Sequence, residues 1–334
     1  MKKLLIIILL VCVGAFAWYK FSLSPVNSKS DDRRAVKIES GMSVRSIAEH
    51  LDKLELIKSP RAFMMFTKFH GTEKNLEAGK FVIRPSMNVA EIVEVLQDGR
   101  AEEMIVTIPE GFTVKDIDEL LTEKGIIEGG EIIACASDCD FETFEFLPSD
   151  QEQAKRGGRL EGYLFPETYY IDVEDFVSKF FIERMLTTFR RRVLEAFPEQ
   201  FENPKHSLHQ VISMASLIEE EALRDDERPI ISGILWKRFD AGMGLGVDAT
   251  VRYIIDKPTG AITVADLNTN SPYNTRKFKG LPPGPIASPG EKSIRATLFP
   301  KESDYWYYLH GDDGKIHYAK TNNEHNLNRI DYIE

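Results

Sequence analysis

The chain has 334 residues, and its 53 acidic and 42 basic side chains give a formal net charge of −11 at pH 7. This negative charge argues against a broad nucleic-acid interface, which needs a basic face to displace phosphate counterions. The length allows two or three domains with sizeable cores. The sequence has no glycine-rich phosphate loop, dinucleotide fingerprint or zinc-ligand spacing, so we expect no cofactor and no metal.

The N-terminus, MKKLLIIILLVCVGAFAWYKF, is an apolar run with basic ends. As a helix, Leu4 to Tyr19 would rise about 24 Å, short of the roughly 30 Å hydrocarbon core. Aromatic residues and Lys20 at its end suit a membrane interface, and lysine can snorkel across the gap. We therefore expect a single-pass anchor over residues 1–20. A signal peptide cleaved after Ala17 is the alternative, and both interpretations export the rest of the chain.

Residues 21–35 lack apolar periodicity and are interpreted as a linker. An internal repeat follows, with IESGMSVRSIAEHLDKLELI starting at Ile38 and IPEGFTVKDIDELLTEKGII starting at Ile108. In each copy a short strand ends at glycine, and Ser43 or Thr113 caps an amphipathic helix.

In the first copy, a second helix begins near Pro60 and AGKFVIRP returns as a strand. The order strand–helix–helix–strand over residues 36–105 resembles a LysM-like unit, which in other proteins binds N-acetylglucosamine-containing glycans. A spacer that holds the active part off the membrane is the alternative. Residues 106–205 form the second repeat-like and connecting region. Within it, Cys135 and Cys139 are either a short disulfide or two unpaired thiols.

Residues 206–334 hold most of the candidate chemistry. SLHQVISMASLIEEEAL predicts a long helix in which three consecutive glutamates follow an apolar segment. Successive residues turn by about 100°, so the three carboxyls meet different surroundings. Glu219 shares a face with Ile212, Ala215, Ala222 and Leu223, and an apolar face is expected to raise the pKa of its carboxyl toward neutrality. A general acid in glycoside cleavage needs that environment, whereas a solvent-exposed rim is the alternative.

Further elements follow this helix. DDERPIISGILWKRFDAGM predicts a second helix, and Asp248 begins a third. The segment TNSPYNTRKFKGLPPGPIASPG is too long for a simple connection, and such loops are usually functional. A capping box with Ser288 and Glu291 is expected to start the next helix. A hairpin is expected to turn at Gly311 to Gly314.

The motifs ASLIEEEA, ERPIISGILWKRFDAGM, DATVRY, SPYNT, GLPPGPIASPG and GKIHYAKTNNEHN occur in the order found in YceG-like endolytic murein transglycosylases. The resemblance covers the chain from about Val36 to His325. It implies an α+β protein with an N-terminal transmembrane helix, a LysM-like subdomain and a mixed α+β catalytic domain. The implied location is the inner membrane, with a single pass and the catalytic domain in the periplasm.

The resemblance also implies an activity. The family cleaves the MurNAc–GlcNAc β-1,4 bond within nascent peptidoglycan strands and leaves 1,6-anhydro-MurNAc ends. Peptidoglycan strands are thus the implied substrate, and wall synthases are expected partners. By position, the family's catalytic glutamate falls on Glu219, while the candidate substrate-binding positions are Glu221, Asp248, Tyr273, Asn274, Pro283 and His325.

One carboxyl is enough for this reaction, because the C6 hydroxyl of MurNAc takes the place of water as the nucleophile. Glu219 is therefore expected to protonate the glycosidic oxygen and then to accept the C6 hydroxyl proton. Two alternatives remain open. One is a hydrolase in which Asp248 or Glu221 activates water. The other is a non-catalytic wall-binding anchor.

Overall fold

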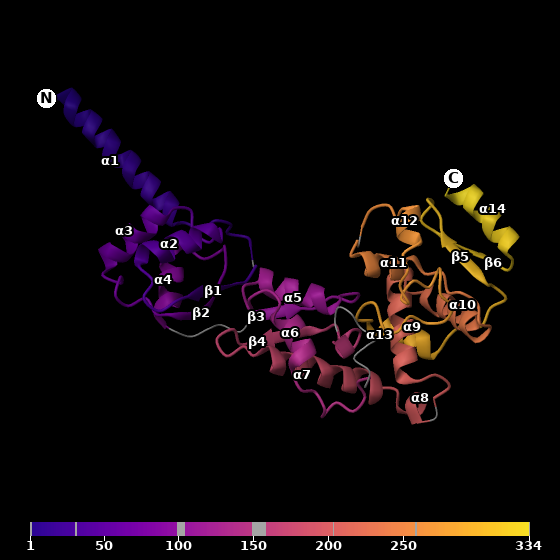
Figure 1. Ribbon diagram of the computed structural model, residues 1–334. Coiled ribbons are helices and arrows are strands. Elements are labelled where there is room, and N and C mark those ends of the chain that lie inside the picture. The colour runs from indigo at the N-terminus through magenta and orange to yellow at the C-terminus, as the bar shows by residue number, and fades with distance from the viewer. Residues whose placement is uncertain are drawn as a thin grey trace. The chain divides into compact units, whose positions relative to one another are not determined.

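The computed structural model describes residues 2–30, 32–98, 104–148, 158–202, 204–257 and 259–333 (Figure 1). Within these ranges, helices alternate with three two-stranded sheets, so the chain belongs to the α+β class, as predicted. The chain divides into two compact units. The first unit comprises Met1–Val106, Leu120–Glu128 and Thr168–Val177, and the second comprises Thr107–Glu119, Gly129–Glu167 and Ser178–Glu334.

The first helix, α1, spans Lys2–Leu23. The side chains of Lys2 and Lys3, expected to flank the anchor, lie outside the described part of the structure. Across the described ranges, no helix combines the length and the apolar character that crossing a membrane requires. The segment after α1 packs against the rest of the first unit, since Asn27 N–H donates to the Pro85 carbonyl at 3.0 Å and Lys58 Nζ to Ser24 Oγ at 2.8 Å.

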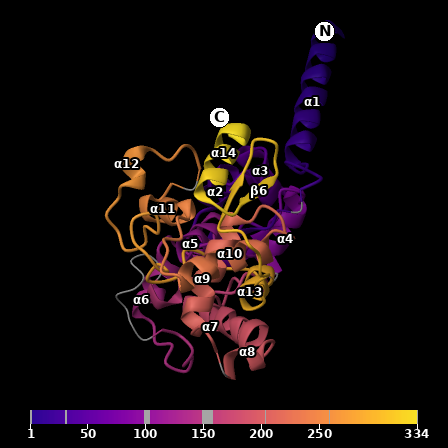
Figure 2. The ribbon, with the colours of Figure 1, turned by 90° about the vertical axis from the view of Figure 1, so that its right-hand side faces the viewer.

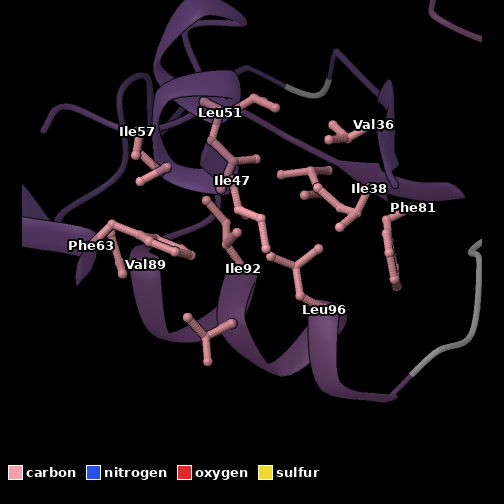
Figure 3. Packing of buried hydrophobic residues seen from close by; sticks show 14 residues of the cluster. Val36, Ile38, Ile47, Leu51, Ile57, Phe63, Phe81, Val89, Ile92 and Leu96 are labelled. Atoms are coloured by element: carbon pink, nitrogen blue, oxygen red, sulfur yellow. The ribbon is translucent and has the colours of Figure 1, made fainter. Parts of the chain in front are cut away.

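The core of the first unit lies between a strand pair and its helices. The elements are β1 (Arg34–Ile38), α2 (Val44–Lys53), α3 (Pro60–His70), β2 (Gly79–Ile83) and α4 (Val89–Asp98). The two strands are antiparallel, with Val36 opposite Phe81. Figure 3 shows the buried side chains that fill the core, among them Ile47, Leu51 and Ile92. The predicted strand–helix–helix–strand order is confirmed.

The second copy of the repeat has the same order of elements along the chain. It consists of β3 (Met104–Thr107), α5 (Val114–Glu123), α6 (Glu131–Asp138) and β4 (Thr168–Ile171), and β3 pairs with β4. The matched glycines Gly41 and Gly111 have φ angles of 87° and 83°, a backbone conformation that favours glycine. Ser43 caps α2, and Thr113 forms a capping box with Asp116 at the start of α5.

Cys135 and Cys139 form a disulfide at the end of α6, which decides between the two alternatives left open by the sequence. The rest of the second unit is mostly helical. Its elements are a 3-10 turn (Gly158–Leu160), α7 (Ser178–Phe189), a π-helix (Arg190–Leu194), α8 (Pro198–Glu202), α9 (Leu208–Glu221), α10 (Arg228–Asp240), α11 (Asp248–Ile255), α12 (Val264–Leu267), α13 (Glu291–Leu298), β5 (Tyr307–His310), β6 (Ile316–Ala319) and α14 (Asn322–Tyr332).

The helices α9, α10 and α13 pack against one another at the centre of the second unit (Figure 2). Ser207 and Gln210 form a capping box that starts α9, and the helix interior is fully buried from Val211 to Ile218. Apolar side chains of α9 and α10, among them Met214, Leu217 and Leu235, form this core. Because α9 is held along its length, the glutamates of its last turn have fixed positions.

Candidate active site

Three consecutive glutamates end α9, and each has different surroundings. Glu219 lies in a buried ion pair, Glu220 borders a small cleft, and Glu221 borders a large cavity. Carboxylates are unfavourable at the C-terminus of a helix, because the helix dipole carries partial negative charge there. Each of the three side chains therefore needs neighbours that offset this cost, or a chemical role that justifies it.

Glu219 forms a salt bridge with Arg228 at the start of α10. Its Oε1 lies 3.1 Å from Arg228 Nη1, and the two side chains are 7% and 11% exposed. Its Oε2 accepts the N–H of Gly290, directly before α13, at 2.8 Å. Arg228 Nη1 also donates to Ser293 Oγ at 2.7 Å. Glu219 therefore links the end of α9 to the starts of α10 and α13.

Two sequence predictions for this region are wrong. Glu219 is buried, as expected, but it faces a guanidinium and a backbone N–H in place of the predicted apolar stripe. The capping box predicted at Ser288 is absent, because α13 starts at Glu291 after Gly290, which has no side chain to act as a cap. The carboxylate of Glu219 accepts a free N–H at this helix start, which is the role of a capping group.

Glu220 borders a cleft of about 130 Å³ between the start of α5 and α11. Its side chain is open to solvent within the cleft, yet protein surrounds it on several sides. This partial burial, together with the negative charges of Glu219, Asp116 and Glu221, raises the pKa of the Glu220 carboxyl to about 7.

We expect Glu220 to make stability depend on pH. Its pKa of about 7 in the folded chain lies above the value of about 4.3 for an unfolded glutamate, so ionisation favours unfolding. The free energy of unfolding is therefore expected to fall as pH rises from about 4.3 to 7. Denaturant unfolding at pH 5 and pH 8 should show a smaller difference in Glu220→Gln than in the wild type. Equal differences in the two proteins would contradict this expectation.

Glu221 borders a cavity of about 610 Å³, within the usual range for ligand pockets. The walls come from α10, α11, α12, β5 and α14 and from the loops around Gly244 and Arg276. Tyr308 Oη donates to Glu221 Oε2 at 2.7 Å. Burial and the nearby carboxylate of Asp248 raise the pKa of the Glu221 carboxyl, although the Tyr308 hydrogen bond acts in the opposite direction. A raised pKa favours the protonated form, which a general acid needs.

Arginine side chains and a second carboxylate complete the walls of this cavity. Arg238 Nε donates to the Trp306 carbonyl and Nη1 to the Leu245 carbonyl, each at 2.7 Å, so it holds the hairpin and a loop around the cavity. Asp248, the first residue of α11, is ion-paired with Arg276, and both side chains are nearly half exposed. The cavity therefore brings together a half-buried protonatable carboxyl and a second, more exposed carboxylate.

His325 also lines this cavity, on α14. Its ring stacks on Tyr307 with centroids 5.3 Å apart, and its buried Nδ1 has no hydrogen-bond partner among the described residues. Burial and the charges of Arg238 and Arg329 lower the pKa of the His325 ring. Three predicted site residues, Glu221, Asp248 and His325, thus meet in one cavity.

The other predicted substrate positions lie elsewhere. Tyr273 is 6% exposed and packs in the core with its ring against Tyr253. Asn274 is fully buried, and its side-chain amide donates to the carbonyls of Leu267 and Thr269, at 2.9 Å in both cases. The carbonyl of Pro283 accepts from a ring nitrogen of His209. None of these three lines the cavity beside Glu221, so their contacts are those of residues that shape loops and core.

Sequence reasoning missed Tyr308 and Arg238. Tyr308 lies 87 residues after Glu221, in a segment recognised only as a hairpin. The alternation of side chains along a strand places Tyr307 and Tyr308 on opposite faces of the hairpin. It does not show that Glu221 is the hydrogen-bond partner of Tyr308. Among the described residues, no three His, Cys, Asp or Glu side chains are grouped as metal ligands would be.

A protonatable carboxyl beside a second carboxylate, in a polar cavity, is the acid–base arrangement used in carbohydrate cleavage. A sequence profile of the YceG-like family matches residues 36–330. The chain is 33% identical over 331 residues to an endolytic murein transglycosylase of Bacillus subtilis. The aligned region covers 97% of this chain and 91% of that protein. This chain therefore belongs to the YceG-like family.

Two further comparisons agree with this assignment. An endolytic murein transglycosylase of Streptococcus pneumoniae is 28% identical over 98% of this chain, which spans 64% of that relative's length. A crystal structure of a YceG-like protein from Listeria monocytogenes has a TM-score of 0.66 and 29% identity, covering 89% of this chain and 99% of that chain.

Proposed function

We propose that this chain is an endolytic murein transglycosylase, which cleaves the MurNAc–GlcNAc β-1,4 bond within peptidoglycan strands and leaves 1,6-anhydro-MurNAc ends. The family match and the two relatives of that name support the activity. The observation that carries the site is the cavity at the end of α9, with a half-buried, protonatable Glu221 on its wall.

We assign the acid–base role to Glu221 rather than to Glu219. Glu219 holds three helix ends together through Arg228 and Gly290, and neither Glu219 nor Arg228 lines the cavity. Glu221 lines the cavity and has a raised pKa, as a proton donor working near neutral pH requires. The proposed acid therefore stays within the glutamate motif identified from the sequence, but it is Glu221 in place of Glu219.

The reaction then needs few groups. Glu221 donates its proton to the glycosidic oxygen while the bond from MurNAc C1 to that oxygen breaks. The carboxylate of Asp248 stabilises the positive charge that develops on the sugar ring. The C6 hydroxyl of the same MurNAc attacks C1 and gives its proton to Glu221, which restores the acid and closes the 1,6-anhydro ring. No water is consumed.

We also propose that α1 anchors the chain in the inner membrane, with the rest of the chain in the periplasm. The apolar N-terminal run supports an anchor, and the Cys135–Cys139 disulfide supports an oxidising compartment. In this arrangement the strand–helix–helix–strand unit would act as a LysM-like glycan-binding module near the membrane. Wall synthases are the expected partners there, because new strands emerge at that surface.

Mass spectrometry of the products tests the activity. The detergent-solubilised full chain is incubated with uncrosslinked glycan strands, and we expect internal fragments that end in 1,6-anhydro-MurNAc. Fragments heavier by one water would identify a hydrolase instead. Strands that are bound but left uncut would identify a wall-binding protein and overturn the proposal.

A further inference from the structure

We propose that the outer face of helix α3 binds the surface of the lipid bilayer beside the anchor α1. Four residues define this face: Arg61, Met65, Lys68 and Phe69. The inference rests on the proposal that α1 anchors the chain in a membrane. It goes further because it assigns a lipid contact to the folded part of the first unit, and it does not depend on which carboxyl acts as the acid.

The four residues of the outer face lie on one side of α3. Their spacing of i, i+4, i+7 and i+8 places them on one helical face. The side chains of Phe69 and Met65 lie in the open, with 73% and 40% of the residue exposed. On the opposite side, Ala62 and Phe63 are fully buried. Helix α3 therefore packs one side into the core and leaves two apolar side chains uncovered on the other.

The charges on the outer face suit an anionic lipid surface. Arg61 and Lys68 accompany the two apolar side chains, and both are exposed. Helix α3 contains no acidic residue, and neither cation forms a salt bridge with another residue in the described ranges. Apolar side chains accompanied by lysine and arginine are typical of helices that lie in a membrane interface, where the cations meet anionic headgroups.

The end of α1 is fixed against α3 within the first unit. The rings of Tyr19 and Phe69 meet edge to face, with centroids 6.5 Å apart. Ser22 is 3% exposed, and Leu23 packs against the core of the unit. The two helices contact each other where α1 ends (Figure 1). The position of the outer face is therefore linked to the position of the anchor.

This contact sets the depth of the outer face. Tryptophan and tyrosine at the end of a membrane helix lie at the level of the lipid headgroups. Trp18 and Tyr19 occupy that place in the apolar run, so Phe69, which touches Tyr19, lies at the same level. An interfacial helix buries its apolar face about 5–10 Å into the boundary between headgroups and acyl chains. The lipid contact removes Phe69 and Met65 from water and gives the first unit a second attachment beside α1.

Spin labels on the full chain, reconstituted in vesicles of phosphatidylethanolamine and phosphatidylglycerol, test the lipid contact. Cys12 is the free cysteine, because Cys135 and Cys139 are bonded to each other. In a Cys12→Ala background, Phe69→Cys therefore carries a single label. We expect oxygen, which concentrates in the bilayer, to reach this label readily. We expect aqueous nickel-EDDA to reach it about fivefold less than a label in water.

Three further labels serve as checks. Met65→Cys places a label one turn away on the same face, and we expect the same protection from nickel there. Glu94→Cys is the matched control, because Glu94 is exposed on α4 of the same unit and lies outside the outer face of α3. We expect its label to be open to nickel. A label on Cys12 of the wild type reports on the anchor, and we expect it to be protected.

These labels separate the lipid contact from the anchor. If the Cys12 label is protected while positions 65 and 69 are as open to nickel as position 94, the lipid contact alone is overturned. A Cys12 label that is open to nickel would overturn the anchor and, with it, this inference. Protection at position 69 together with spin–spin broadening would show that a second copy of the chain covers the face, which would also overturn the lipid contact.

Discussion

Replacing Glu221 by glutamine is expected to lower the turnover of glycan strands by about 10³-fold or more, because a positioned general acid contributes on that order and glutamine has no acidic proton. The amide has nearly the same shape and its oxygen can still accept from Tyr308 Oη, so the fold should be kept. The measurement is the initial rate of strand cleavage, with circular dichroism to verify folding.

Glu220→Gln is the neighbouring control for this loss. Glu220 borders the small cleft and does not line the cavity beside Glu221, so its amide should leave turnover close to that of the wild type. A folded Glu221→Gln protein that cleaves strands at a rate within a few-fold of the wild type would remove Glu221 from the mechanism.

The largest effect on stability is expected from Arg228→Met. The methionine is of similar length but removes the only cation that pairs with Glu219 among the described residues, and it leaves that carboxylate buried. Breaking a buried ion pair in this way destabilises proteins by about 3–5 kcal/mol. Urea unfolding followed by tryptophan fluorescence should show this loss, because Trp236 and Trp306 both lie in the second unit.

Lys292→Met removes a cation from the same neighbourhood without burying a charge. Its ion pair with Asp225 is exposed, with side chains 63% and 59% accessible, and such pairs add little to stability. We expect the Lys292 variant to unfold at nearly the wild-type urea concentration. If both variants lost the same stability, the buried pair would have no special role in holding the three helix ends together.

Features that depend on neighbouring residues could be predicted from the sequence. Ser43 and Thr113 each start a helix where a capping residue was expected, and each accepts a backbone N–H within the next turn. Pro60 likewise begins α3. The hairpin and the strand–helix–helix–strand order of the first copy follow from the same short-range signals.

The roles of the glutamates could not be predicted in this way, for two physical reasons. The helical face inferred for Glu219 assumed that α9 continues to Leu223, but the helix ends at Glu221, and Leu223 is 69% exposed. The partners that distinguish the carboxyls also come from distant segments. Arg228 belongs to the next helix and Tyr308 to the hairpin, so only the folded chain shows which carboxyl is neutralised and which faces a cavity.

The most direct test of the central claim compares Glu219→Gln with Glu221→Gln in one assay of strand cleavage. Rates are measured per folded molecule, at a temperature well below either unfolding midpoint. We predict that Glu219→Gln is less stable yet cleaves at a rate within a few-fold of the wild type, while Glu221→Gln gives no anhydro ends. The reverse order, an inactive but folded Glu219→Gln beside an active Glu221→Gln, would contradict the assignment of the acid to the cavity.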